Sequence, residues 1–206
     1  MKDKVNEIFN YMRELFGEAP KVELDYITDI DLLVAVILSA QCTDVRVNKV
    51  MKELTKKYHT VQDYANADTK EFERAIHSCG FYRNKAKNII NMARMVISDF
   101  GGVIPADLES LVKLPGVGRK TASVFLAEFY QLPAIAVDTH VIRVSGRLGL
   151  TASRNPDIIE RDLAQIIDKQ NWRLVNLYLV LFGRYYCRAK KPTCDSCKIR
   201  MHCGMI

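Results

Sequence analysis

The chain has 206 residues, of which 49% are hydrophobic and 26% are charged, and 30 basic against 24 acidic residues leave a net charge of +6. This composition indicates a globular protein long enough to bury a core, in one domain or in two small ones. No apolar run reaches the roughly 18 to 20 residues of a membrane span, and the N-terminus does not resemble a secretory signal, so we expect a soluble intracellular protein. The positive charge is compatible with a polyanionic partner but does not require one.

Apolar residues recur with helical spacing along almost the whole chain, and no stretch alternates with period two for long enough to predict a strand. Glycines, prolines and capping side chains divide this pattern into segments. We therefore predict an all-α protein. The predicted helices span residues 5–16, 32–40, 44–58, 61–65, 69–79, 83–100, 107–113, 120–130, 138–148, 156–168 and 172–186.

The second of these helices, 32–40, has no polar face. A helix that is apolar all round is buried, so we place this one at the centre of the fold. Asp29 or Asp31 is expected to cap its N-terminus, and the polar stretch 41–44 is expected to end it.

The stretch Leu114–Ala122 reads L-P-G-V-G-R-K-T-A, which predicts a tight turn followed by the start of a helix. Gly116 and Gly118 allow backbone angles that other residues resist. A glycine turn that leads into a helix N-terminus points backbone N–H groups outward, so it can hold a phosphate without reading a base. Lys120 lies on the first turn of that helix.

Each of these features also has an ordinary structural explanation. A Pro-Gly-Val-Gly sequence is most often only a turn, and a lysine after it most often lies on a solvated helix face. Asp138 follows the apolar residues 135–137 and is well placed to cap the next helix, and by itself its position favours that structural role. The chemical alternative is a phosphate-binding turn that brings an amine, Lys120, and a carboxylate, Asp138, to one place.

Six cysteines in such a chain do not indicate a disulfide framework. Four of them lie near the C-terminus with the spacing C-x6-C-x2-C-x5-C, namely Cys187, Cys194, Cys197 and Cys203. A closely spaced thiolate quartet can bind one tetrahedral zinc ion or one four-iron cluster, and the spacing leaves both open, zinc being the commoner. The other two, Cys42 and Cys79, lack a partner motif and are expected to be small buried hydrophobic residues.

Four motifs in this order carry a resemblance to a known family. They are I-L-S-A-Q at 37–41, the turn and helix start at 114–122, V-D-T-H-V at 137–141, and the four-cysteine loop. Together they resemble the endonuclease III family, the helix-hairpin-helix DNA glycosylases, over nearly the whole chain.

The resemblance implies a two-lobed all-α fold with a DNA groove between the lobes. Residues 21–132 would form a helical-bundle domain with the helix-hairpin-helix. Residues 1–20 and 133–206 would form a discontinuous domain with a structural [4Fe-4S] cluster on the four cysteines, so the resemblance favours iron–sulfur over zinc. It further implies a monomer that acts on damaged double-stranded DNA in the cytoplasm, with the chromosome.

The implied activity is that of a bifunctional enzyme of base excision repair, which removes oxidised pyrimidines and then cuts the strand 3′ to the abasic site. The damaged base must first be flipped out of the stack. An amine that attacks C1′ leads to a Schiff base, whose acidified C2′ proton allows β-elimination. Lys120 is the expected nucleophile, and we expect partial burial, Arg119 beside it and the helix N-terminus beneath it all to lower its pKa and so favour its neutral form. Asp138 would stay ionised and stabilise positive charge on the sugar.

Other DNA contacts follow from the same resemblance. Gln41 resembles the residue that fills the gap left by the extruded base, and a polar helix end is the structural alternative. Phe81 stands where the family carries an aliphatic wedge, and an aromatic ring can stack between bases, but core packing is an equal alternative. Arg188, Lys190 and Lys191 are expected both to bind phosphates and to balance the charge of the thiolates. Further contacts are expected at Gly116, Gly118, Arg119, Thr121, His140 and Arg143.

A second hypothesis belongs to a different class. The chain could be a non-catalytic DNA-binding protein with an iron–sulfur or zinc centre, in which Lys120 and Asp138 are a salt bridge and a helix cap. Borohydride separates the two hypotheses, because it reduces a Schiff base to a permanent protein–DNA crosslink that a mere binder cannot form.

Overall fold

A computed structural model describes residues 2–204, and all regular secondary structure within that range is helical. The prediction of an all-α protein is therefore confirmed. The chain divides into two compact units, one formed by Glu23–Tyr130 and the other by the residues up to Val22 together with those from Gln131 onward. None of the helices between residues 2 and 204 is both long and apolar enough to cross a bilayer.

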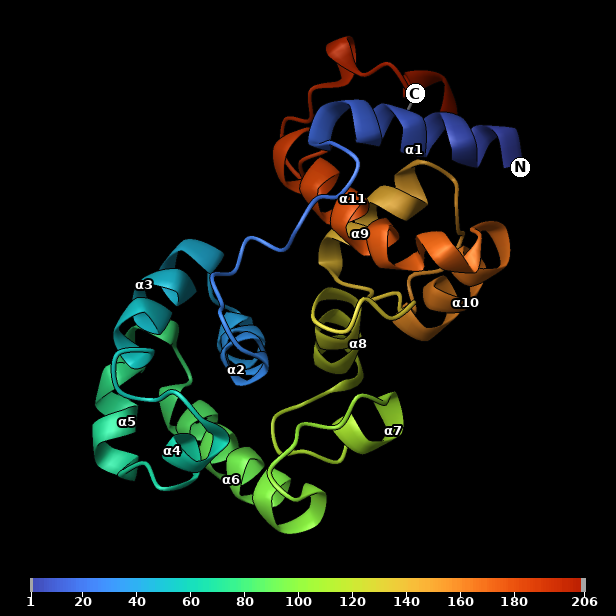
Figure 1. Ribbon diagram of the computed structural model, residues 1–206. Helices are drawn as coiled ribbons and strands as arrows, with labels where there is room; N and C mark the ends of the chain where they lie inside the picture. The colour runs from blue at the N-terminus through green and yellow to red at the C-terminus, as the bar shows by residue number, and fades with distance from the viewer. Residues whose placement is uncertain (1, 205–206) are drawn as a thin grey trace. The chain divides into compact units, whose positions relative to one another are not determined.

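The unit Glu23–Tyr130 holds seven α-helices and one short 3-10 helix in the described chain (Figure 1). They are α2 (Asp29–Ser39), α3 (Asp44–Leu54), α4 (Val61–Ala65), α5 (Thr69–Ala75), η1 (His77–Cys79), α6 (Tyr82–Phe100), α7 (Leu108–Leu111) and α8 (Arg119–Glu128).

Helix α2 is the centre of this unit. All its residues from Ile30 to Leu38 are buried, as its apolar sequence predicts. It contacts α3, α6 and α8, so these helices shield its apolar surface on several sides. Burial of this surface is the main source of stability for the unit.

The N-terminal cap of α2 differs from the prediction. Thr28, not Asp29 or Asp31, is the N-cap, and its hydroxyl accepts a hydrogen bond from the Asp31 backbone N–H at 3.3 Å. The Asp31 carboxylate accepts in return from the Thr28 backbone N–H at 3.0 Å. This reciprocal capping box explains why Asp31 stays inside the first turn, where its charge also opposes the helix dipole.

Helix α3 is shorter than predicted, because it ends at Leu54 and not near Tyr58. Tyr58 is buried, and its ring stacks on Tyr64 with 5.2 Å between centroids and meets Phe72 edge-on at 5.4 Å. The chain leaves the helix to place Tyr58 in this aromatic cluster. The predicted helix 69–79 is likewise split, into α5 and η1, at Ile76.

The second unit contains α1 (Lys2–Phe16), α9 (Thr139–Arg147), α10 (Pro156–Ile166), η2 (Lys169–Asn171), α11 (Trp172–Tyr185), η3 (Cys194–Ser196) and η4 (Arg200–His202). Helix α11 packs against both α1 and α9, as Figure 1 shows. Buried side chains from all three helices form its core, among them Ile8, Met12, Val141, Val144 and Phe182.

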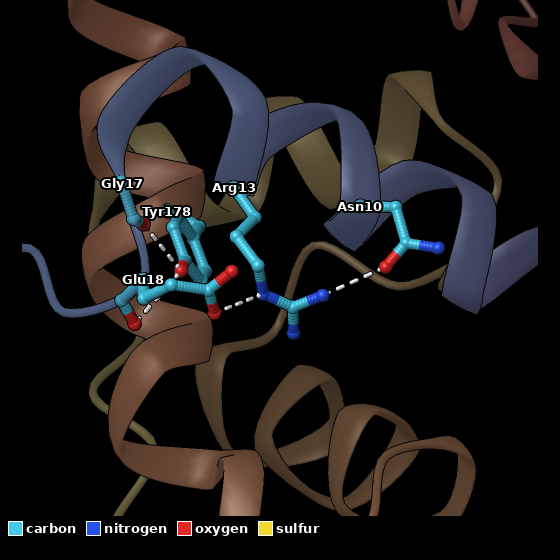
Figure 2. A network of polar contacts seen from close by, with 5 residues as sticks. All are labelled: Asn10, Arg13, Gly17, Glu18 and Tyr178. Carbon is cyan, nitrogen blue, oxygen red and sulfur yellow. Dashed lines mark hydrogen bonds and ion pairs between the residues drawn. The ribbon is translucent and has the colours of Figure 1, made fainter.

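Tyr178 joins the end of α1 to α11 (Figure 2). Its hydroxyl donates to the carbonyl oxygens of Gly17 at 2.8 Å and Glu18 at 3.2 Å. The Arg13 guanidinium lies 2.8 Å from the Glu18 carboxylate and donates to Asn10 at 2.7 Å. The two Tyr178 bonds hold the end of α1 against α11, so residues about 160 positions apart in sequence share one core.

Candidate functional site

The predicted turn is formed by Leu114–Val117, and the Val117 backbone N–H donates to the Leu114 carbonyl at 3.0 Å. Pro115 and Gly116 are its two central residues, and Gly116 has a φ of +79°. This is the residue pattern of a type II turn. Leu114 and Val117 are both buried, so the turn is anchored in the core of its unit.

Helix α8 begins directly after this turn, with Gly118 as an N-cap that has no side chain to satisfy the first N–H groups. Such N–H groups and the positive end of the helix dipole favour an anion. Arg119 and Lys120 are the first two helical residues, and both are exposed, whereas Thr121 is half-buried. The partial burial that we expected for Lys120 is therefore wrong for the protein without DNA.

Gly116 is required by both its conformation and its surroundings. A Cβ atom added to it would lie 2.8 Å from Cβ of Asn88 on α6, closer than such atoms approach one another. A left-handed backbone also costs a residue with a side chain about 1–2 kcal/mol. The turn therefore approaches α6 at a distance that only glycine allows.

We expect Gly116→Ala to lower the free energy of unfolding in urea by about 1–3 kcal/mol, because strain and steric overlap add. Gly118→Ala is the matched control, because the φ of Gly118 is −83° and an added Cβ meets nothing within 4 Å. The Gly118→Ala variant should lose less than about 1 kcal/mol of its free energy of unfolding, which is the usual effect of changing an N-cap residue. Equal losses for the two variants would contradict this account of the turn.

Gln41 and Phe81 lie on exposed loops of the same unit, and both have left-handed backbones, with φ values of 55° and 47°. Phe81 is 65% exposed and is the N-cap of α6, so the alternative that it packs in the core is wrong. An exposed aromatic ring in a strained backbone conformation is typical of functional sites. Cys79, two residues earlier, is buried as predicted, and Cys42 is half-buried.

Asp138 belongs to the other unit, where it is the N-cap of α9. Its half-buried carboxylate accepts a hydrogen bond from the Val141 backbone N–H at 2.8 Å. Asp138 therefore caps α9, as its position in the sequence predicts. The second carboxylate oxygen is not needed for this bond, so a capping role leaves room for a chemical one.

His140 and Arg143 serve the packing of α9 against α11. The Arg143 guanidinium donates to the carbonyls of Gly183 at 2.9 Å and Cys187 at 3.2 Å, and it lies 3.1 Å from Nδ1 of His140. Burial lowers the pKa of His140, and the charge of Arg143 lowers it too, whereas Asp138 raises it. These contacts are internal, so DNA binding by the two residues stays a prediction.

The four C-terminal cysteines line one cavity of about 120 Å³, together with Phe182 and Tyr186. All four thiols are half-buried and free. Burial raises the pKa of the Cys197 thiol, a backbone hydrogen bond from Ile199 lowers it, and the neighbouring thiols raise it. The quartet predicted from spacing is therefore assembled around one space.

This cavity suits a group of several atoms. A single water molecule needs only about 10–15 Å³ of such space. Between residues 2 and 204, no three His, Cys, Asp or Glu side chains are grouped as ligands of one metal ion. Four thiols that line one cavity are a donor set that a structural metal centre can use, either a zinc ion or a four-iron cluster.

Arg147, at the end of α9, fastens the cysteine loop and was not predicted. It donates to the carbonyl of Arg188 at 2.8 Å and contacts both the carbonyl and the sulfur of Cys187 at 3.3 Å. Two side-chain contacts also tie the loop to α1, the ion pair of Lys198 with Glu14 at 2.8 Å and the contact of the His202 ring with the Glu7 carboxylate at 2.7 Å. No local sequence signal marks Arg147, because its partners lie about 40 residues away in the chain.

The basic residues of the loop fall into two groups. Lys198 is paired with Glu14, and Arg200 lies 3.6 Å from Asp195. Arg188, Lys190 and Lys191, which lie between the first two cysteines, are exposed. Exposed basic side chains on a fastened loop are suited to phosphate contacts.

Residues 34–169 match the family model described as the HhH-GPD superfamily base excision DNA repair protein. Curated relatives, each named endonuclease III, cover 98% of this chain. The protein from Synechocystis sp. is 45% identical with 92% of its length covered, that from Bacillus subtilis 43% with 89%, and that from Escherichia coli 38% with 95%.

A solved structure of a trapped endonuclease III–DNA covalent intermediate has a TM-score of 0.94 and 43% sequence identity, over 99% of this chain and 96% of that one. A non-covalent endonuclease III–DNA complex matches with the same score and identity, over 99% of this chain and 95% of that one. Motifs, fold and full-length similarity agree, and the chain belongs to the endonuclease III family of the HhH-GPD superfamily of base excision DNA repair proteins.

Proposed function

We propose that this protein is a bifunctional DNA glycosylase and abasic-site lyase of base excision repair, which excises oxidised pyrimidines from duplex DNA. The observation that carries the proposal is the exposed amine of Lys120 on the first turn of α8, directly after the Leu114–Val117 turn. A relative with 43% identity has been solved as a covalent intermediate with DNA, which supports a covalent route for this chain as well.

In the proposed reaction, the N–H groups of the turn and of the α8 N-terminus bind a phosphate beside the extruded nucleotide. The neutral amine of Lys120 attacks C1′ and the bond between C1′ and the damaged base breaks, so the base leaves with a proton. The sugar ring then opens to a Schiff base. Loss of the C2′ proton expels the 3′ phosphate, which cuts the strand, and hydrolysis releases Lys120.

Asp138 is proposed to be the carboxylate of this reaction. An ionised carboxylate stabilises positive charge that develops on the sugar as the base departs, and it can accept and return protons. The cap bond to Val141 uses one of its oxygens and holds the group in place. A fixed carboxylate needs little reorganisation when charge develops, which is an advantage in catalysis.

Gln41 and Phe81 are proposed to enter the DNA helix at the lesion. Phe81 presents an exposed ring that can stack on bases, where a base–aromatic contact contributes about 1–3 kcal/mol. The amide of Gln41 can replace hydrogen bonds of the missing base. Arg188, Lys190 and Lys191 are proposed to bind the DNA backbone.

The four cysteines are proposed to hold a [4Fe-4S] cluster. Four thiols around one cavity of about 120 Å³ fit that group, and Arg147, Lys198 and His202 fasten the loop that carries them. When bound, the cluster supplies structural crosslinks between Cys187, Cys194, Cys197 and Cys203. The chain's own contribution is to present the exposed basic residues from a fixed loop.

Replacing Cys194 by serine is expected to lower the iron and sulfide content and the visible absorbance of the purified protein, because a hydroxyl is a poor iron ligand. The salt dependence of DNA binding should also weaken. The slope of log affinity against log salt concentration should become less steep by up to about 2–3 if three phosphate contacts are lost. Cys42→Ser is the control and should keep the iron, because Cys42 lies outside the cavity. Full iron content in Cys194→Ser would contradict the ligand set.

The proposal extends to partner and location. We place the protein in the cytoplasm, where it would act as a monomer on damaged double-stranded DNA of the chromosome. We propose that it has two domains, a helical-bundle domain of residues 21–132 and a discontinuous domain of residues 1–20 and 133–206. The chain passes from one compact unit to the other after Val22 and after Tyr130, in each case two residues from the proposed domain boundary.

The proposal is tested by borohydride trapping on a duplex that carries one oxidised pyrimidine. The purified protein should form a crosslink that survives denaturing electrophoresis, and an undamaged duplex or the omission of borohydride should give none. If the protein binds the damaged duplex tightly but gives neither crosslink nor strand cleavage, it is a binding protein and the proposed activity is wrong.

A further inference from the structure

Lys85 is a buried lysine with three backbone partners. It lies on the first turn of α6 with only 6% of its surface exposed. Its Nζ donates to the carbonyl oxygens of Leu38 at 2.9 Å, Ala40 at 2.8 Å and Cys79 at 2.9 Å. An ammonium group has three N–H donors, so each one is used.

The three carbonyls belong to two different helix ends. Leu38 and Ala40 lie at the C-terminal end of α2, and Cys79 is the last residue of η1. Carbonyl groups at helix ends lack partners within the helix, and a positive charge there is favourable. Lys85 therefore caps two helix ends at once, which accounts for its burial without a carboxylate.

Two of these carbonyls sit at the start of the loops that carry Gln41 and Phe81. The Ala40 carbonyl is part of the peptide group that joins Ala40 to Gln41. The Cys79 carbonyl is part of the peptide group before Gly80, which immediately precedes Phe81. Because a peptide group is planar, a hydrogen bond to its oxygen orients the chain that follows it.

The residues that follow have backbone conformations that require support. The φ values are 55° at Gln41, 67° at Gly80 and 47° at Phe81. A left-handed conformation costs a residue with a side chain about 1–2 kcal/mol and persists only when the surroundings impose it. One ammonium group bonded to the start of both loops is a support of this kind.

We propose that Lys85 is a positioning residue for lesion recognition, which holds the Gln41 loop and the Phe81 loop in a single fixed arrangement through their backbones. This role rests on the proposed function, because it assumes that both side chains enter damaged DNA. Lys85 itself is buried and acts only through the two loops. Removal of Lys85 would therefore uncouple the loops and weaken lesion binding more than binding to intact DNA.

The test is a double-mutant cycle on DNA affinity, measured by fluorescence anisotropy with two duplexes, one undamaged and one with a stable abasic-site analogue. Lys85→Met keeps the aliphatic stem and removes all three donors. We expect it to lower affinity for the abasic duplex about tenfold, the equivalent of one lost contact of moderate strength, and to change affinity for the undamaged duplex less than about twofold.

The cycle separates positioning from general stability. In the wild-type background Gln41→Ala and Phe81→Ala should each lower affinity for the abasic duplex about tenfold. In the Lys85→Met background the same changes should cost less than about twofold, because the side chains are no longer held in place. Lys85→Arg, which retains charge and donors, should regain part of the affinity.

Lys87→Met is the matched control, since Lys87 is an exposed lysine on the same helix, and it should leave the ratio of the two affinities unchanged. If Lys85→Met does not fold, as judged by circular dichroism, the cycle is run with Lys85→Gln, whose shorter amide bonds fewer carbonyls. The role of Lys85 is overturned if the losses of affinity in the double mutants are the sums of those in the single mutants. It is also overturned if Lys85→Met lowers affinity equally for both duplexes. A wild type without preference for the abasic duplex overturns the proposed function itself and this role with it.

Discussion

Replacing Lys120 by glutamine is expected to abolish the borohydride crosslink and to lower strand cleavage at an abasic site on the order of 10³-fold or more, as loss of a nucleophile does in other enzymes. An amide nitrogen has no basic lone pair, so it cannot form a Schiff base. Lys120 is exposed and lies on the first turn of α8, so the substitution should change the free energy of unfolding by less than about 0.5 kcal/mol.

DNA affinity gives the necessary control for this variant. Because the N–H groups of the turn remain, binding to a stable abasic-site analogue should stay within a few-fold of wild type. Lys113→Gln changes another exposed lysine of the same unit, just before the turn, and should retain the crosslink. A crosslink of normal yield with Lys120→Gln would place the nucleophile on another amine.

Replacing Asp138 by asparagine is expected to lower excision of an oxidised base about 10²- to 10⁴-fold, the range typical of a lost acid–base group. Asparagine caps a helix as well as aspartate does, so the bond to the Val141 N–H should persist and stability should change little. The two roles of Asp138 can therefore be separated by one substitution. Excision is measured as release of free base from a labelled duplex.

Crosslinking to a preformed abasic site should be far less affected by Asp138→Asn, because no base has to leave in that reaction. Asp107→Asn is the matched control, since Asp107 caps α7 by accepting from the Ser110 N–H at 2.8 Å. It should retain full excision. If Asp138→Ala and Asp138→Asn lose stability and activity in parallel, Asp138 is only a helix cap.

The turn and the first residues of α8 illustrate what local sequence can predict. Proline and glycine at the centre of a turn, followed by a helix start, specify the conformation through neighbouring residues alone. The structure has this turn at Leu114–Val117 and the helix start at Arg119. Partial burial of Lys120 was predicted, but the side chain is exposed. Burial depends on what packs above a helix end, which the sequence of the helix does not show.

Helix ends show the limit of the same local signals. Thr28 and Asp31 both suit a helix start, and only their reciprocal hydrogen bonds decide which one is the cap. Helix α3 ends early because Tyr58 packs with Tyr64 and Phe72, which follow it by six and more positions in the chain. Such packing overrides propensity and leaves no mark in the segment itself.

The all-α fold, the position of the tight turn, the four thiols that line one cavity and the family of the motifs could all be predicted from the amino-acid sequence alone. Each of these depends on short spacings along the chain. Three features could be seen only in the folded chain: Phe81 is exposed in a left-handed conformation, Arg147 fastens the cysteine loop, and Lys85 bonds the starts of the Gln41 and Phe81 loops. These features depend on groups that are far apart along the chain. Lys85 and Leu38 are 47 positions apart, and Arg147 and Cys187 are 40 apart, so the folded chain alone brings these groups within hydrogen-bonding distance.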